Sequence, residues 1–405
     1  MQSGLLILFL VATMRGVRAF NLVRGFIPAP TSRRHFRASA LSMKLQTGIV
    51  GLPNVGKSTL FNALVGSQAA QAANFPFCTI EPNVGMVNVP DKRLTNLGVI
   101  NSSEKVVPAT MEFVDIAGIV KGASEGEGLG NKFLTNIRMT DAIVHVVRCF
   151  VDDDIIHVDG TVDPKRDMEI ISLELVLADL AQVEKVFEKR QRDKKTPPEE
   201  VSALQKVNKV LMEGKAARTA GLTPDEALSI KSLMLLTLKP VIYAANVADS
   251  DLSKGNAMSK IVYDHAQAEG NKAVLVSAQV ESELSGLTPE EREEFLAALD
   301  VTDEQCGLKA LVNTAYDALG LQTYFTSGPT ETRAWTIMKG YTAPQAAGVI
   351  HTDFEKGFIR AETISYDDMI KAGSEKACKE KGLLRSEGRD YVMAEGDIVL
   401  FRFNV

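Results

Sequence analysis

The first residues that indicate chemistry lie in 47–64, which reads TGIVGLPNVGKSTLFNAL. Gly51 is followed, after four residues, by Gly56, Lys57 and Ser58, the spacing G-x-x-x-x-G-K-[ST]. Glycines let the backbone curl so that its N–H groups face phosphate oxygens, the lysine reaches the β- and γ-phosphates, and the hydroxyl ligates Mg²⁺. The predicted phosphate loop comprises Asn54, Val55, Gly56, Lys57, Ser58 and Thr59, with Lys57 also serving catalysis.

Two downstream segments complete the phosphate end of such a site. Thr79, within NFPFCTIEPN, is placed where a switch threonine closes on Mg²⁺. Asp115 and Gly118 form a D-x-x-G after an apolar strand. In that motif the carboxylate holds Mg²⁺ through water and the glycine N–H senses a γ-phosphate. We therefore predict Ser58 and Thr79 as metal ligands, with Asp115 and Gly118 at the nucleotide.

Two later segments are placed for base recognition. Asn246, Val247 and Asp249 directly follow an apolar strand expected at 241–245, and Ser277 follows the next one. The carboxyl ends of parallel strands meet at one edge of a sheet, so these segments are expected beside the phosphate loop. Together the five elements predict a P-loop nucleoside triphosphatase of the switch type.

Length and composition agree with a multidomain globular protein. The chain has 405 residues and is 45% hydrophobic, enough for two or three domains with proper cores. Its four cysteines are far apart and form no C-x-x-C pair. This argues against a disulfide framework or a zinc site and favours a reducing compartment.

Residues 1–43 differ from the rest because they contain six arginines and no acid. An apolar run at 5–12 is too short for a membrane span, and an Ala19-Phe20 junction precedes an Arg/Ser-rich segment. This resembles a two-part plastid leader, so we predict import into a plastid; alternatively Met43 is the true start and the protein is cytoplasmic. Without the leader the formal net charge is −12 in place of −6. Contact with RNA must then come from local basic patches, and no membrane partner is expected for the mature protein.

Alternating strands and helices predict a doubly wound α/β domain over residues 44–300. Residues of about 165–236 interrupt it with helices expected at 170–191, 201–212 and 224–235, which indicates an inserted helical hairpin. The hairpin tip is rich in Lys185, Lys189, Arg190, Arg192, Lys194 and Lys195. This cluster is either a solvated helix face or a contact for RNA or the ribosome. The pattern of residues 320–405 predicts an α+β module. We expect short strands, which include 348–350 and 390–392, and one helix at 366–381.

From Lys44 to Val405 the chain resembles the YchF subfamily of Obg-like ATPases, among the Obg-related P-loop NTPases. The resemblance rests on GLPNVGKST, NFPFCTIEPN, MEFVDIAG, VKGASEGEGLGNKFL, HVVRCF, APQAAGVIHTDFEKGFIRAE and FRFNV. It implies an OBG-type nucleotide domain with a coiled-coil hairpin and a C-terminal β-grasp TGS domain. It also implies Mg²⁺-dependent ATP hydrolysis and action on ribosomes or translation.

The base loop departs from related patterns. Guanine-specific relatives carry N-K-x-D, whereas Val247 stands here in place of the lysine, and the family usually ends the motif in Glu where this chain has Asp249. We expect ATP to be preferred over GTP, with the Asn246 amide pairing with the adenine N6/N7 edge. Binding of GTP as well stays open because Asp249 can accept from guanine.

Catalysis needs a group that orients water, and Ile119 occupies the position where many switch NTPases have glutamine. One candidate is Asn54, which the resemblance suggests recruits K⁺. Another is His157, in a polar loop after a strand, with an ordinary surface-loop role as the alternative. His145 lies in an apolar strand and is expected in the core, and His351 has no catalytic partner in the sequence.

Three functions remain open. The leading one is a switch ATPase that acts on ribosomes. The alternatives are a ribosome-assembly GTPase and a nucleotide-gated ribosome-binding adaptor whose turnover is incidental.

Overall fold

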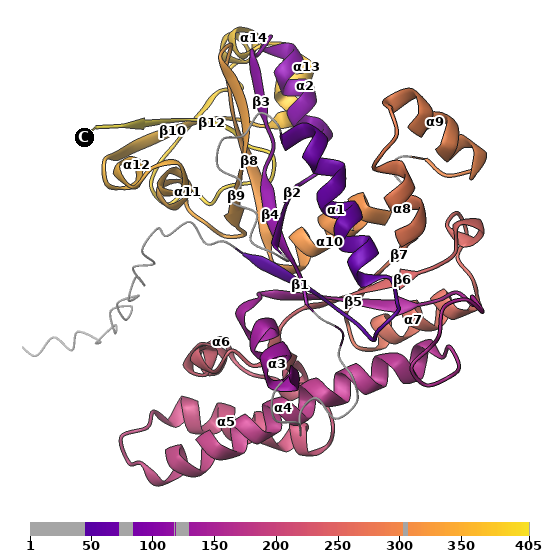
Figure 1. Ribbon diagram of the computed structural model, residues 1–405. Coiled ribbons are helices and arrows are strands. Elements are labelled where there is room, and N and C mark those ends of the chain that lie inside the picture. Colours follow the sequence, from indigo (N-terminus) through magenta and orange to yellow (C-terminus); the bar gives the residue numbers. More distant parts are fainter. Residues whose placement is uncertain (1–44, 73–83, 117, 119–128, 303–306, 405) are drawn as a thin grey trace, which may run out of the picture. The chain divides into compact units, whose positions relative to one another are not determined.

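The structure is a computed structural model that describes residues 45–72, 84–116, 118, 129–302 and 307–404 (Figure 1). The leader, Thr79, Ile119 and most of the glycine-rich loop before residue 130 lie outside these described residues. The described residues form two six-stranded sheets.

The first sheet has the strand order β2-β4-β1-β5-β6-β7 and is parallel except where β2 pairs with β4. Its strands are β1 (Gln46–Val50), β2 (Val84–Asn88), β4 (Thr110–Asp115), β5 (Ala142–Arg148), β6 (Val241–Asn246) and β7 (Lys272–Val276). Every residue of β5 and β6 is buried, as expected for parallel strands covered on both faces. The α/β fold predicted from strand and helix alternation is confirmed.

Helices connect these strands and carry recognisable start signals. They are α1 (Lys57–Ala72), α2 (Lys92–Ile100), α3 (Leu129–Met139), α7 (Ala257–Ala268), α8 (Ala278–Leu284), α9 (Pro289–Ala298) and α10 (Gly307–Ala318), with a 3-10 turn η4 (Asp249–Asp251). The Asp91 side chain caps α2 by accepting from the Arg93 N–H. Asn256 and Ser259 form a reciprocal capping box at the start of α7.

The inserted segment forms the expected helical hairpin, α4 (Pro164–Arg192) and α5 (Pro198–Met212). Only residues 193–197 join the two helices, which pack against each other around a core of their own that includes Val183 and Leu204. The helix expected at 224–235 is wrong beyond Ser229. There α6 (Pro224–Ser229) is followed by two 3-10 turns, η2 (Lys231–Leu233) and η3 (Leu236–Leu238). Met234 ends η2 in the left-handed region, which a helix cannot continue through. A further 3-10 turn, η1 (Ala217–Ala220), precedes α6.

The C-terminal module is an α+β unit built on the second sheet, with strand order β11-β10-β12-β8-β9-β3. Its own elements are β8 (Leu321–Ser327), β9 (Glu331–Met338), α11 (Ala343–Ile350), α12 (Thr352–Lys356), β10 (Phe358–Ile364), α13 (Tyr366–Ala372), α14 (Glu375–Glu380), β11 (Arg385–Glu387) and β12 (Ile398–Phe403). The sixth strand, β3 (Lys105–Val107), comes from the nucleotide domain and pairs in parallel with β9. The α+β expectation is confirmed, and the assignment as a β-grasp TGS domain stays a prediction.

Three expectations for this module are wrong. Residues 348–350 are not a strand but the end of α11, which begins with a capping box between Thr342 and Gln345. Residues 390–392 contribute only one isolated bridge, from Val392 to Thr342. The helix expected at 366–381 is two helices, because Gly373 adopts φ 79° and ends α13.

No helix within the described ranges combines the length and apolarity needed to cross a membrane.

Candidate functional site

The predicted site residues lie where strands of the parallel sheet end. β1 leads into the phosphate loop, β4 ends at Asp115, β5 at Arg148, β6 at Asn246, and Ser277 follows β7. Since these strands are parallel neighbours, their carboxyl ends form one edge, the usual ligand-binding edge of an α/β sheet.

The phosphate loop has the backbone that its sequence predicts. Gly56 has φ 92°, and a Cβ at this position would lie 2.5 Å from the Asn246 Nδ2 atom, so only glycine fits. Asn54 has φ 60°, a left-handed conformation that asparagine tolerates, and its side chain is exposed. Ser58 and Thr59 are exposed in the first turn of α1, whereas Val55 is buried.

Lys57 lies beneath the loop. Its side chain is 7% exposed and Nζ donates to the Leu52 carbonyl oxygen at 2.7 Å. Burial lowers the pKa of Lys57 to about 8, and the negative charge of Asp115 opposes that shift. A Cβ on Gly118 would lie 3.1 Å from Nζ, so the D-x-x-G glycine approaches this ammonium. The predicted phosphate lysine is therefore held next to the predicted γ-phosphate sensor.

The residues present fit a magnesium ion. Ser58 Oγ donates to Asp115 Oδ2 at 3.0 Å, and Asp115 Oδ1 is buried without a hydrogen-bond partner among the described residues. A hydroxyl and a carboxylate so close together are the hard oxygen donors that Mg²⁺ prefers. Thr79, the other predicted ligand, is outside the described residues.

Asn246 is buried and bonded to protein groups on two sides. Its Nδ2 donates to the Val55 carbonyl at 2.9 Å, its Oδ1 accepts from the Ala278 N–H at 2.9 Å, and it is 3% exposed. The amide joins the phosphate loop to the loop after β7. These bonds use one of its two N–H donors and one of the two lone pairs of its oxygen, so the pairing with adenine stays a prediction. These two bonds connect two walls of the site.

The other base-loop residues have mixed positions. Val247 is buried and its N–H donates to the Val276 carbonyl at 2.9 Å. Ser277 is fully buried and caps α8 by accepting from the Val280 N–H. Asp249 is exposed, and its carboxylate accepts from the Ser250 N–H at 3.1 Å, so this carboxylate is open to solvent where a ligand could meet it.

A pocket that the sequence did not predict adjoins the base loop. It has a volume of about 340 Å³ and is lined by Phe150 and Val151 after β5, Ala248 and Asp251 after β6, and Asn256, Ala257 and Met258 at the start of α7. The volume is within the range of small-molecule sites, roughly 300–1,000 Å³. A sequence signal was present, because Phe150 lies two residues after the apolar strand Ala142–Arg148 at this edge.

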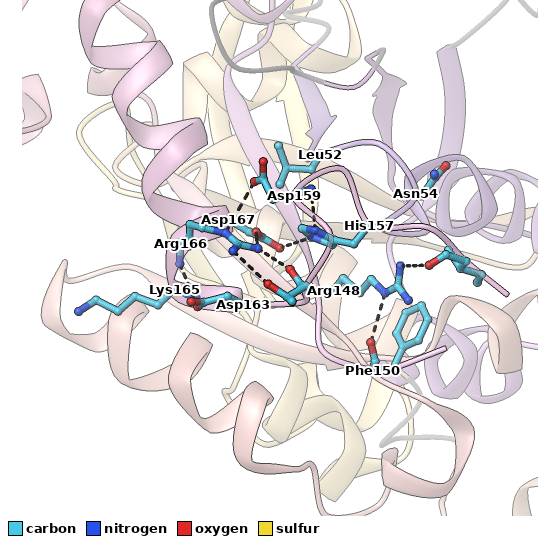
Figure 2. Close-up of polar contacts among 12 residues, drawn as sticks. Leu52, Asn54, Arg148, Phe150, His157, Asp159, Asp163, Lys165, Arg166 and Asp167 are labelled. Carbon is cyan, nitrogen blue, oxygen red and sulfur yellow. Dashed lines mark hydrogen bonds and ion pairs between the residues drawn. The ribbon is translucent and has the colours of Figure 1, made fainter. Parts of the chain in front are cut away.

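His157 lies in the loop that reaches the phosphate loop, but its ring is engaged elsewhere. Ile156 O accepts from Asn54 Nδ2 at 3.1 Å. The His157 ring is 5% exposed, with Nε2 2.9 Å from Asp167 Oδ2 and Nδ1 accepting from the Asp159 N–H at 3.2 Å. Figure 2 shows the ring directed toward these partners and not toward Asn54. His157 is thus neither an exposed loop residue nor placed to hold a water in this arrangement, and its catalytic role stays a prediction.

The remaining histidines considered from the sequence have structural roles. His145 is buried in β5 with its ring 5.3 Å from that of Tyr243, and burial lowers its pKa to about 3. This confirms its expected place in the core. His351 is exposed and caps α12, accepting from the Asp353 N–H.

A parallel sheet whose first strand leads into this loop, with Lys57, Ser58 and Asp115 gathered at its carboxyl edge, defines a P-loop nucleoside triphosphatase. Comparison with known proteins narrows the class. A family model described as "50S ribosome-binding GTPase" matches residues 46–196, and the model YchF-GTPase_C, described as a protein of unknown function, matches residues 321–404.

Whole-length relatives agree with these matches. The chain is 52% identical over 367 residues to a Haemophilus ducreyi protein and 49% identical over 370 residues to a Bacillus subtilis protein, both named "Ribosome-binding ATPase YchF". Each alignment covers 90% of this chain and all of the relative. The solved structure of the Schizosaccharomyces pombe YchF GTPase is similar with a TM-score of 0.80 and 41% identity, over 89% of this chain and 98% of that one. The chain belongs to the YchF family.

Proposed function

We propose that the protein binds and hydrolyses ATP at the carboxyl edge of its parallel sheet and acts on the ribosome. The observation that carries the hydrolase part is the convergence of buried Lys57 with the Ser58–Asp115 pair next to Gly118. The names of the relatives, "Ribosome-binding ATPase YchF", support ATP and the ribosome as substrate and partner.

Ser58 and Asp115 would hold Mg²⁺, with Thr79 as a further predicted ligand. When bound, the ion neutralises charge that develops on the β- and γ-phosphate oxygens. Lys57 binds the same oxygens, and the N–H groups of the phosphate loop orient them. These residues supply positioning and electrostatic stabilisation, the main contributions to phosphoryl transfer.

The base is proposed to occupy the pocket lined by Phe150, Val151 and Ala248. Its apolar wall suits the face of a purine, and Asp249 at the neighbouring loop is exposed to meet the edge of the ring. Val247 cannot cover a base as a lysine stem does, because it is buried. We therefore keep ATP as the preferred nucleotide, although the relatives' names include both ATPase and GTPase.

Calorimetric titration with ADP and GDP tests this assignment. We expect ADP to bind more tightly than GDP, and Phe150→Ala to weaken ADP binding at least about tenfold, as loss of an aromatic wall predicts. Tighter binding of GDP would favour the alternative of a ribosome-assembly GTPase. Wild-type affinity in Phe150→Ala would remove the base from this pocket.

Asn54 is proposed to recruit K⁺, which would supply the charge that a catalytic arginine gives in other NTPases. Its Nδ2 is used by Ile156 O, which leaves Oδ1 for a cation. Replacing K⁺ by Na⁺ is expected to slow single-turnover hydrolysis. An unchanged rate would exclude this role.

The hairpin tip is proposed as the RNA contact. Lys185, Lys189 and Arg192 follow the three- and four-residue spacing of one helix face and are exposed, and Arg190 is paired with Glu200 at 2.9 Å. Because the chain is otherwise acidic, a local cationic face of this kind is what favours a phosphate backbone.

A triple charge reversal at Lys185, Lys189 and Arg192 tests the tip by cosedimentation with ribosomes over a range of salt. We expect weaker binding and a smaller salt dependence, by about one unit of slope for each phosphate that the variant no longer neutralises. The matched control reverses Lys371, Lys376 and Lys379, which are exposed in the C-terminal module. Equal effects of the two triple variants would assign the weaker binding to net charge and not to the tip.

A further inference from the structure

Arg148 is an unusual feature of the edge that binds the nucleotide. It is the last residue of β5 and only 1% exposed, yet no ion pair of its guanidinium is found in the described part of the chain. A buried arginine is normally paired with a carboxylate because an uncompensated buried charge is costly. Its charge must therefore be stabilised in another way.

Backbone carbonyls provide that stabilisation. Arg148 Nε donates to Phe150 O at 3.2 Å, Nη2 to Asp152 O at 3.1 Å and Nη1 to Ile155 O at 3.0 Å, and the guanidinium lies 4.7 Å from the centre of the Phe150 ring. Figure 2 shows the Arg148 guanidinium beside Phe150, with its bond to the Phe150 carbonyl as a dashed line. A planar guanidinium fixes the directions of its donors, so one side chain determines the course of residues 150–156.

The two ends of segment 150–156 reach different parts of the nucleotide site. At one end Phe150 and Val151 line the pocket beside the base loop. At the other, Ile156 O accepts from Asn54 of the phosphate loop. The segment is also tied at its start, because the Cys149 N–H donates to Asn246 O at 2.8 Å.

We propose that Arg148 is a positioning residue for nucleotide binding, which holds Phe150 against the base and Ile156 against the phosphate loop at the same time. This rests on the proposed function, since it assumes that a nucleotide base occupies the Phe150 pocket. Arg148 touches neither base nor phosphate in this role and acts through the segment that it organises.

A double-mutant cycle on ADP affinity separates this role from simple fold stabilisation. Arg148→Met and Phe150→Ala are each expected to weaken ADP binding at least about tenfold. If Arg148 acts through segment 150–156, the loss of ADP affinity in the double variant is clearly smaller than the product of the two single losses, and the loss beyond that of Phe150→Ala measures the share that passes through Ile156. If Arg148 only stabilises the fold, the two losses multiply, and that result would overturn the proposal, as would wild-type affinity in Arg148→Met.

Two further variants keep the test decisive. Arg148→Lys retains the charge without the planar fork, and the same cycle is run with it if Arg148→Met does not fold. Arg389→Met is the matched control, because Arg389 also donates to a backbone carbonyl, Phe358 O at 2.9 Å, but in the C-terminal module. It is expected to leave ADP affinity unchanged; an equal loss in this control would overturn the assignment to Arg148. ADP binding by the wild type is measured first. If the wild type does not bind ADP, the proposed function itself is wrong. If the wild type binds ADP but the losses of the two single variants multiply in the double variant, only the role of Arg148 is wrong.

Discussion

Replacing Asn246 by alanine removes the amide that joins the phosphate loop to the loop after β7. Two buried groups lose their partners, the Val55 carbonyl and the Ala278 N–H, each bonded at 2.9 Å. Because these two bonds shape the site in the same way for either nucleotide, we expect ATP and GTP affinities to fall together. This outcome differs from that of a base-reading asparagine, whose loss changes one nucleotide more than the other.

The size of the effect follows from burial. A buried polar group left unsatisfied costs about 1–3 kcal/mol, so two such groups lower the free energy of unfolding by about 2–6 kcal/mol. If about 1.4 kcal/mol of this falls on the nucleotide-bound arrangement, both affinities decrease about tenfold. The ratio of the two affinities should then stay within about threefold of wild type.

Calorimetric titration with both nucleotides, together with urea unfolding, measures these quantities. Asn271→Ala serves as the control, since the Asn271 amide donates to exposed Glu269 at 2.8 Å, away from the site. A selective loss of ATP affinity with unchanged GTP affinity and stability would refute the structural role and support Asn246 as a base reader.

Three other predictions follow from the site and the leader. If the His157 ring leaves Asp167 to orient water, His157→Ala should lower the single-turnover rate of hydrolysis by about 10²–10⁴-fold. Asp167→Ala should lower the same rate far less. Equal effects of the two variants would mean that the pair has only a structural role. Burial lowers the pKa of Lys57 to about 8, so roughly nine-tenths of this side chain is uncharged at pH 9. Because a bound phosphate favours the charged lysine, nucleotide binding at pH 9 should take up close to one proton. At pH 7 the lysine is already charged, and binding should take up almost none. Calorimetry in buffers of different ionisation enthalpy measures that uptake, and its absence at pH 9 would contradict the position of Lys57 over the phosphates. A fluorescent fusion of residues 1–45 is expected to enter plastids, and a cytosolic signal would instead support Met43 as the start.

The phosphate end of the site was predictable because its chemistry is local. The run from Gly51 to Ser58 specifies a loop, a cation and a hydroxyl within eight residues, and strand order then places Asp115 beside them. The role of Asn246 was not predictable, because the sequence does not show which protein groups already occupy its amide. Arg148 was missed for a similar reason, since its three carbonyl partners are brought to it only by the path of residues 150–156.

The fold shows the same division. Central strands such as β5 and β6 are long apolar runs that burial on both faces requires. By contrast, β3 pairs with β9 more than two hundred residues away, and nothing local in Lys105–Val107 indicates that partner. The helix at 343–350 did have a start signal in the sequence, because Thr342 and Gln345 have capping-box spacing and Pro344 lies in the first turn. The short apolar run at 348–350 was instead interpreted as a strand.

The most direct test of the central claim is turnover of ATP and GTP by wild type and Lys57→Ala, each with and without ribosomes. The proposed function predicts Mg²⁺-dependent ATP hydrolysis by the wild type that exceeds GTP hydrolysis and rises with ribosomes, with the activity lost in Lys57→Ala while the variant stays folded. Hydrolysis that persists in Lys57→Ala, or a wild type that hydrolyses neither nucleotide even with ribosomes, would contradict it.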